Sequence, residues 1–221
     1  MIQKLPKWVE AGGFLLAFIA GSINSVGLLG FKHQAVSHLT GISTFLSLEI
    51  AFQNSTEILH LLLVMLSFLM GAILSGFVVG NTALKLGRHY SIALIIESCL
   101  LFASFISFKN GSVFSYYLCS AACGLQNAIT SSFSGSLIRT THVSGLFTDI
   151  GIMIGLRLRG KKADTRKVIL YCTLIVGFIS GGIIGAISFQ HFSYDAILLP
   201  SILSSIVAIL YWLYLYSQSR A

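Results

Sequence analysis

The sequence predicts an all-α integral membrane protein with about six transmembrane helices and two short re-entrant or half-spanning helices, arranged as two repeated halves. Three observations predict this fold: apolar segments of membrane-spanning length, two apolar segments that are too short to span, and motifs that occur twice in the same order. The halves are residues 1–109 and 110–221, which together form one membrane domain. Loop charges favour an inverted relation between them.

Long apolar segments indicate the membrane class. The chain is 55% hydrophobic and 10% charged, with a mean hydropathy of +0.87, whereas soluble domains carry about 25% charged residues. A spanning helix needs roughly 20 mostly apolar residues. Six segments of that length contain no Asp, Glu, Lys or Arg except Glu97 in the third: residues 11–31, 58–84, 89–108, 110–138, 168–194 and 196–219.

Two shorter apolar segments, residues 39–52 and 140–156, lie between the long ones. A helix of about 14 residues is roughly 21 Å long, which is less than the ~30 Å thickness of the hydrocarbon core. We therefore expect a re-entrant or half-spanning helix at each of these segments.

Motifs that occur twice predict the two halves. A Gly-x-x-Asn motif ends at Asn24 and again at Asn127, and a Ser/Thr-His-x-Thr/Ser-Gly motif surrounds His38 and again His142. A segment rich in small residues at 68–76 also recurs at 178–186. Matches in the same order indicate that each half contains a long span, a short segment and two further long spans.

The distribution of Lys and Arg favours six crossings over eight. If the short segments do not cross and the N-terminus is cytoplasmic, twelve of the 14 basic residues lie inside, and Lys32 and Lys109 lie outside. Eight crossings would divide them ten to four, which fits the positive-inside rule less well but leaves that count open. Six crossings place both termini in the cytoplasm and invert the second half relative to the first.

Polar residues near the short segments are candidates for a binding site. Ser37 and Thr141 are candidate N-caps, and the helix starts that follow them would offer free N–H groups and a partial positive charge to an anion or polar solute. The alternative is that both histidines and both asparagines are structural, bonding neighbouring helices. The candidate substrate-binding residues are Asn24, His38, Thr40, Gly41, Asn127, His142, Ser144, Gly145 and Asp149.

Glu97 and Asp149 are ionisable residues flanked by apolar ones. Such residues at membrane depth usually face a cavity and serve ion or proton pathways, so both are candidates for ion coupling. The alternative is that they are neutral structural groups. Asp149 has the stronger case because it follows His142 by one to two helical turns.

Other chemistry finds little support. The sequence has no Walker A motif, no dinucleotide-binding glycine motif, no nucleophile elbow and no His-Glu-x-x-His. The four cysteines lie in apolar segments and are interpreted as packed thiols, so we expect no metal and no cofactor. The net charge of +7 comes from short loops and is interpreted as a topology signal rather than a nucleic-acid surface.

The two blocks that contain these motifs resemble the YoaK-like family of bacterial membrane proteins. The first block runs from Asn24 to Gly41, and the second runs from Gly124 to Gly145. The resemblance covers nearly the whole chain and implies a protein of the bacterial cytoplasmic membrane with around six spans. The family has no assigned biochemical function, so the resemblance implies no substrate and no catalytic residue.

Three hypotheses for the function follow. The leading one is a secondary transporter or channel for a small polar or anionic solute, with the lipid bilayer and that solute as partners. The second is a membrane-embedded enzyme that uses His38, His142 and Asp149 for acid–base chemistry. The third is a non-catalytic membrane partner whose glycine-rich helix faces pack against other chains, or against a second copy in a homo-oligomer.

Overall fold

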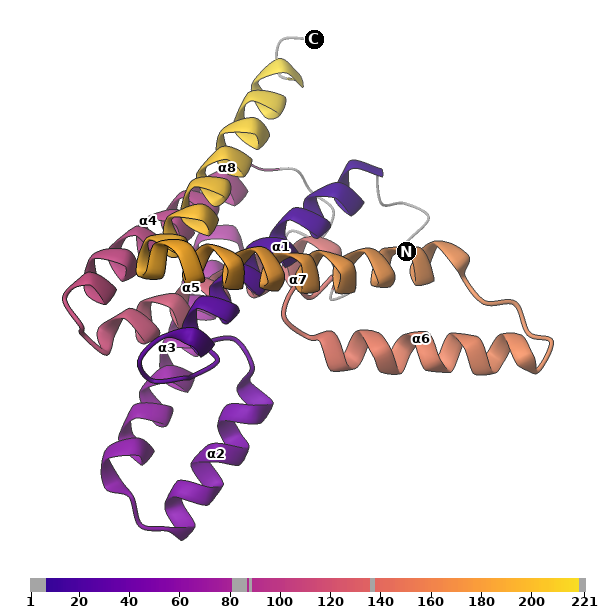
Figure 1. Ribbon diagram of the computed structural model, residues 1–221. Coiled ribbons are helices and arrows are strands. Elements are labelled where there is room, and N and C mark those ends of the chain that lie inside the picture. The colour runs from indigo at the N-terminus through magenta and orange to yellow at the C-terminus, as the bar shows by residue number, and fades with distance from the viewer. Residues whose placement is uncertain (1–6, 81–86, 88, 136–137, 219–221) are drawn as a thin grey trace.

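The computed structural model describes residues 7–80, 87, 89–135 and 138–218, and the chain in these ranges is helical apart from short connections. The all-helical prediction is confirmed for these residues, and the helices follow the predicted order of lengths (Figure 1). Residues 1–109 contain α1 (Lys7–Leu29), α2 (Leu39–Ala51), α3 (Ser55–Val79) and α4 (His89–Lys109). Residues 110–221 contain α5 (Phe114–Ser134), α6 (Val143–Leu158), α7 (Thr165–Phe192), the short 3₁₀ helix η2 (Ser193–Ile197) and α8 (Leu198–Gln218).

Apolar stretches long enough to cross a bilayer make this a multi-pass membrane protein. Within the described residues they are Val9–Leu29, Ser55–Val79, His89–Lys109 and Thr165–Ser217, and the last contains both α7 and α8. Large apolar side chains project outward from these helices, and Phe77 on α3 is 88% exposed. Such a surface is stable in hydrocarbon and costly in water.

Helix α5 is less apolar than the other long helices because it lies inside the bundle. Twelve of its 21 residues are buried, among them Ser120 and Gln126, and it contacts both α3 and α4. The Ser120 hydroxyl donates a hydrogen bond to the Val64 carbonyl of α3 at 2.8 Å. A helix enclosed by protein meets hydrogen-bonding partners rather than lipid, so small polar residues are favourable there.

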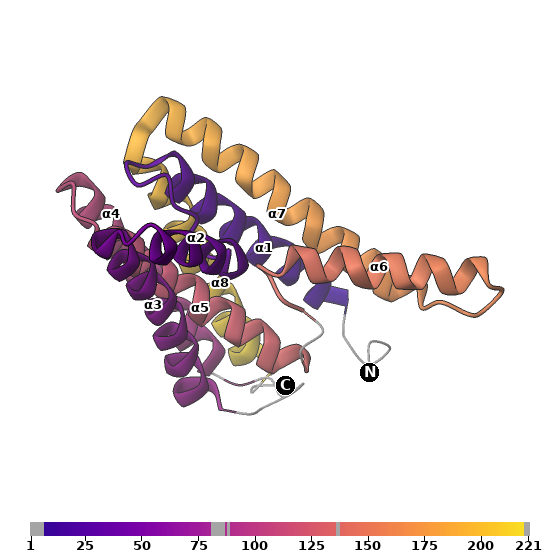
Figure 2. The same cartoon turned by 90° about the horizontal axis from the view of Figure 1, so that it is seen from below.

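The most extensive helix contacts join α1 with α7 and α3 with α5. Helices α1 and α7 run parallel, because the residue numbers at their contacts rise together on both helices. A Cβ on Gly177 would lie 2.7 Å from the Phe14 carbonyl oxygen, and one on Gly185 would lie 2.8 Å from the Ser22 carbonyl oxygen. Between these contacts, the Ser22 hydroxyl donates to the Gly181 carbonyl at 3.0 Å. Figure 2 shows the two helices side by side.

Four glycines allow both of these helix pairs to approach at backbone distance. A Cβ at any of them would overlap a carbonyl oxygen of the facing helix: Gly21 faces Phe178, Gly181 faces Phe18, Gly71 faces Ala121 and Gly124 faces Phe68. Small residues allow such close packing between helices in membranes. The glycine steps on α7 are therefore covered by α1 within the chain, whereas Gly76 on α3 has no neighbour within 4 Å of an added Cβ.

Helices α4 and α8 run antiparallel. The rings of Tyr90 and Tyr211 lie 6.1 Å apart near the start of α4 and the end of α8. Further along, Ser98 and Ser201 exchange hydrogen bonds, each hydroxyl donating to the carbonyl of the other residue at 2.8 and 3.0 Å. Residue numbers thus rise on one helix as they fall on the other.

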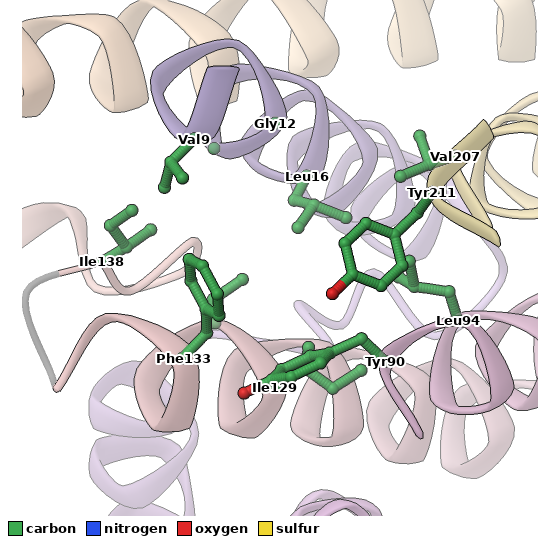
Figure 3. A pocket seen from close by; sticks show the side chains of 12 residues that line it. Val9, Gly12, Leu16, Tyr90, Leu94, Ile129, Phe133, Ile138, Val207 and Tyr211 are labelled. Atoms are coloured by element: carbon green, nitrogen blue, oxygen red, sulfur yellow. The ribbon is translucent and has the colours of Figure 1, made fainter. Parts of the chain in front are cut away.

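Helices α1 and α5 also run antiparallel. An apolar cavity of about 100 Å³ lies where the starts of α1 and α4 meet the ends of α5 and α8 (Figure 3). Val9 from α1 and Phe133 from α5 both line it. At the opposite end of the bundle, the N–H of Lys32, just after α1, donates to the hydroxyl of Tyr116 at the start of α5 at 2.8 Å.

The short helices α2 and α6 lie outside this bundle. Helix α2 packs against α3 and helix α6 packs against α7, and Figure 1 shows the two extending away in different directions. They contain 13 and 16 residues, which gives lengths of roughly 20 and 24 Å and agrees with the expected half-spanning size.

Four of the basic residues that favour six crossings, Lys4, Lys85, Arg88 and Arg220, lie outside the described residues. Within the described chain, the Arg166 Nε lies 3.0 Å from the Glu10 carboxylate, which joins the start of α7 to the start of α1.

Candidate functional site

A cavity of about 560 Å³ lies where the starts of α2 and α6 come together beside the long helices. Most of the predicted substrate-binding side chains line this central cavity: Asn24, His38, Thr40, Asn127, His142 and Ser144. Its walls also contain Ser37, Leu39, Phe68, Ser131, Arg139, Thr141, Val143, Phe178 and Ile179. Residues separated by about half the chain therefore converge on one space, as the hypothesis of a binding site requires.

The lining of the central cavity comes in pairs from the two recurring motifs. Both motif asparagines and both motif histidines line it, together with the residues on either side of each histidine. The phenylalanines that begin the recurring glycine-rich segments, Phe68 and Phe178, line it as well. The cavity thus has similar chemistry on two sides, with amide, imidazole, hydroxyl and aromatic groups on each.

Asn24 holds the connection between α1 and α2 in place. Its Oδ1 accepts hydrogen bonds from the backbone N–H of Val36 at 3.2 Å, the N–H of Ser37 at 3.3 Å and the Ser37 hydroxyl at 3.1 Å. These bonds hold residues 36 and 37 against α1. The structural interpretation therefore applies to the carbonyl group of Asn24, although the side chain also lines the cavity.

The second half anchors its connection through a different residue. The Thr140 hydroxyl donates to Oε1 of Gln126 at 3.1 Å, and both residues are almost fully buried. Asn127, the counterpart of Asn24 in the motif, has a buried Oδ1 without a hydrogen-bond partner. Because an unpaired buried acceptor is costly, Asn127 is the side chain in the cavity wall with the strongest need for a further donor.

His38 and His142 occupy the N-cap positions of α2 and α6, and neither makes a side-chain capping hydrogen bond. The prediction that Ser37 and Thr141 are the N-caps is therefore wrong. The Ser37 hydroxyl donates to Asn24 instead. Without a side-chain cap, the N–H groups of each first turn lack an acceptor and carry the positive end of the helix dipole. Both positive ends lie at the central cavity.

The glycine that follows each histidine makes room for the imidazole ring. A Cβ on Gly41 would lie 2.7 Å from Nδ1 of His38, and a Cβ on Gly145 would overlap the ring of His142. Both glycines were predicted to bind substrate, and the nearest neighbour of each is the ring of the histidine that precedes the same helix. Each glycine therefore leaves space for that ring.

A second polar cavity of about 450 Å³ adjoins the first along α6. Both cavities are lined by Arg139, His142 and Ser144. The second alone is also lined by Gly145 and Asp149 of α6 and by Tyr171 of α7. Asp149 interacts with the Tyr171 hydroxyl across this cavity, and Arg139 forms no ion pair among the described residues. The second cavity therefore contains side chains of opposite charge.

Glu97 lies away from both polar cavities. It is fully buried on α4, and its Oε2 accepts a hydrogen bond from the Ser204 hydroxyl of α8 at 2.9 Å. The apolar cavity in Figure 3, between α1, α4, α5 and α8, does not include it either. The structure thus places Asp149 beside the predicted binding residues and keeps Glu97 apart from them.

Sequence reasoning missed the side chains that complete the site. Arg139 was counted only as a topology signal, although its position three residues before His142 places it in both polar cavities. Gln126 and Tyr171 were not predicted as site residues, because their importance depends on contacts between distant segments. A basic residue next to a motif histidine was the one available signal. Among the described residues, no three His, Cys, Asp or Glu side chains are grouped as a metal site.

Comparison with known proteins identifies a family for most of the chain. A family model described as "Protein of unknown function (DUF1275)" matches residues 12–210. This match agrees with the resemblance to the YoaK-like membrane proteins. No curated protein and no solved structure matches the chain.

Proposed function

The chain belongs to the DUF1275 family, and on that premise we propose that it is a secondary transporter or channel for a small polar or anionic solute. One observation carries the proposal: the recurring motifs of both halves line a single polar cavity. In transporters built from inverted repeats, the substrate site lies between the repeats, at the ends of discontinuous helices. The starts of α2 and α6 both line the central cavity, which supports this comparison.

Six crossings and inverted halves are part of this proposal. The first helices of the two halves, α1 and α5, run antiparallel, and so do the last helices, α4 and α8. Parallel halves with eight crossings would make each of these pairs parallel. The loops before α2 and α6 then enter the membrane from opposite sides and meet at the central cavity.

The solute contacts follow from the cavity lining. Asn127, Thr40 and Ser144 supply hydrogen bonds, and the starts of α2 and α6 favour negative charge. Arg139 adds a full positive charge next to His142. The second cavity, with Asp149, continues along α6 and provides a polar path away from the centre. Asp149 and Glu97 remain our candidates for ion coupling.

The proposed setting is the bacterial cytoplasmic membrane, with both termini in the cytoplasm, as the loop charges and the family resemblance suggest. The bilayer and the solute are the expected partners. A homo-oligomer would use an uncovered glycine face such as that of Gly76, because α1 covers the glycines of α7.

Swelling of proteoliposomes tests the function and the solute class together. The purified full-length protein is reconstituted with valinomycin, and light scattering follows swelling in isosmotic potassium formate, nitrate or chloride, or in glycerol or urea. We expect swelling above that of protein-free liposomes in at least one class. Asn127→Ala combined with Ser144→Ala should reduce the rate roughly tenfold, as expected when polar contacts to the solute are removed.

The lipid-facing variant Phe77→Ala is the matched control and should swell like the native protein, because that side chain is 88% exposed. Equal rates for the native protein and the cavity variant would exclude the central cavity as the path. Absence of swelling in every solute, with no exchange of any labelled member of the same panel, would contradict the transport proposal.

The number of crossings has a separate test. A single cysteine replaces Gly87 in a chain that lacks the native cysteines, and intact cells are treated with a membrane-impermeant thiol reagent. Protection places the connection between α3 and α4 in the cytoplasm and agrees with six crossings. With the N-terminus in the cytoplasm, labelling places it outside, which requires eight crossings and removes the basis for re-entrant segments.

A further inference from the structure

Glu97 is a carboxyl group inside the protein without a basic partner. It is fully buried, and no Lys, Arg or His in the described chain pairs with it. The Ser204 hydroxyl satisfies Oε2, and Oε1 has no hydrogen-bond partner. An ionised carboxylate so poorly solvated is very costly. The site therefore suits a carboxyl that takes up and releases a proton.

Gln126 on α5 is the polar neighbour that faces Glu97. Its side chain is close enough to the carboxyl to interact with it, yet Nε2 of Gln126 and Oε1 of Glu97 are both buried without a hydrogen-bond partner. One of these atoms is a donor and the other is an acceptor. The two groups are complementary and close to each other, so a hydrogen bond between them is available.

The other end of the Gln126 amide reaches the loop before α6. Its Oε1 accepts the hydrogen bond from the Thr140 hydroxyl at 3.1 Å. The next two residues, Thr141 and His142, line the central cavity. A single buried side chain thus connects a lone carboxyl between α4 and α8 with the loop that forms one wall of the proposed solute site.

We propose that Glu97 is a proton-binding site, and that Gln126 transmits its charge state through Thr140 to the loop that carries His142. The ligand is a proton from the aqueous phase, which binds to and leaves a carboxylate oxygen. The part of this inference that concerns solute movement rests on the proposed transport function. Proton binding and the response of the loop do not.

The two charge states of Glu97 make different demands on Gln126. A carboxylate strongly attracts the Nε2 donor, because hydrogen bonds to an ionised acceptor are about twice as strong as neutral ones. A protonated carboxyl attracts it less and leaves the amide with Thr140. Loss of the proton therefore draws the amide toward α4 and weakens or moves its bond to the loop.

Few other groups compete for this role around Glu97. Helix α8 presents the Ser204 hydroxyl, and α5 presents the Cys123 thiol in addition to Gln126. Among the described residues, Cys123 is the titratable side chain that these contacts place near Glu97. A Cys123→Ala background removes it from any measurement of pH dependence.

Infrared difference spectroscopy tests proton binding directly. The full-length Cys123→Ala protein in lipid nanodiscs is compared at acidic and alkaline pH, and the carbonyl band of a protonated, buried carboxylic acid is followed. We expect a band that disappears at alkaline pH and is absent at every pH in Glu97→Gln. A band that persists unchanged after Glu97→Gln, or no band in the Cys123→Ala protein that retains Glu97, would overturn the proposal.

A thiol-labelling ratio tests the link to the loop. In a chain without native cysteines, Thr141→Cys reports on the loop and Ser131→Cys, in the same cavity on α5, controls for access and thiol ionisation. We expect the ratio of their rates with a soluble maleimide to change roughly tenfold with pH, comparable to loss of a charge-assisted hydrogen bond. Glu97→Gln, Gln126→Leu and Thr140→Val should each remove this change.

Ser98→Ala is the matched control, because Ser98 lies in the same interface of α4 and α8 and bonds Ser201 and Ser205 rather than Glu97. It should retain the pH response. A ratio that does not change with pH, or that changes equally in Glu97→Gln, would refute the link between Glu97 and the loop. Neither experiment measures solute movement. Failure of the proton-binding proposal is therefore distinguishable from failure of the transport proposal.

Discussion

The connections that lead into α2 and α6 share a motif and a cavity, but they are anchored by different side chains. In the first half, Asn24 accepts three hydrogen bonds from residues 36 and 37. In the second half, Asn127 leaves its Oδ1 unpaired, and Gln126 anchors Thr140. The same side chain type therefore anchors the loop in one half and leaves its carbonyl oxygen without a partner in the other.

The two halves also differ in the charged residues near the motif histidines. Three residues before His142 stands Arg139, where Ala35 precedes His38, and seven residues after it stands Asp149, where Phe45 follows His38. The first half thus combines a well-anchored loop with an uncharged lining. The second combines a loop anchored by Gln126 with Arg139 and Asp149 in its cavity walls. The two halves therefore differ both in how the loop is held and in the charge beside it.

The largest expected effect concerns a feature that the halves share, the backbone approach at Gly71 and Gly181. We expect Gly71→Ala and Gly181→Ala each to lower the free energy of unfolding by about 3 kcal/mol, because the new Cβ overlaps a carbonyl oxygen. Thermal unfolding of the purified protein measures the loss. Gly76→Ala, where the Cβ meets nothing within 4 Å, should instead stabilise by roughly 0.5–1 kcal/mol.

Similar losses at Gly71 and Gly181 would show that the two helix pairs are equivalent in packing. A loss at only one of them would break that equivalence. An equal response of all three glycines would mean that close approach does not control stability.

A smaller effect sharpens the contrast between the two asparagines. Asn24→Ala should destabilise by about 2 kcal/mol, because it leaves buried donors of residues 36 and 37 without an acceptor. Asn127→Ala should change the free energy of unfolding by less than about 0.5 kcal/mol. Thermal unfolding of the two variants side by side gives the difference. Equal destabilisation would contradict the assignment of anchoring to Asn24 alone.

The smallest effect concerns ion pairs at the two ends of the bundle. Lys32 pairs with Glu57 near the start of α3, and Arg166 pairs with Glu10 near the start of α1. All four side chains are partly exposed, so Glu57→Gln and Glu10→Gln should each cost less than about 1 kcal/mol. The cost should shrink as ionic strength rises. A larger, salt-independent loss would indicate that one of the ends depends on its ion pair.

The length of the apolar segments predicted the helices well, and the residue types predicted the chemistry of the site less well. The short helices at 39–52 and 140–156 were predicted within a few residues because their apolar length and flanking polar residues are local properties. The convergence of Asn24 and Asn127 on one cavity was expected from the recurring motifs. The N-cap at Ser37 was predicted wrongly, because its hydroxyl donates to Asn24, which lies 13 residues earlier in the chain.

By itself, the sequence determined the membrane class, the helical composition, the alternation of long and short helices and six of the residues that line the central cavity. These follow from the solvent, because hydrocarbon requires long apolar helices with internally satisfied backbones wherever the chain crosses. Only the tertiary structure decided which helices pair, that α1 and α5 run antiparallel, and that Gln126 rather than Asn127 anchors the second loop. Such outcomes depend on which polar atoms meet across the bundle, and hydrogen bonds between distant segments leave no periodic trace in the chain.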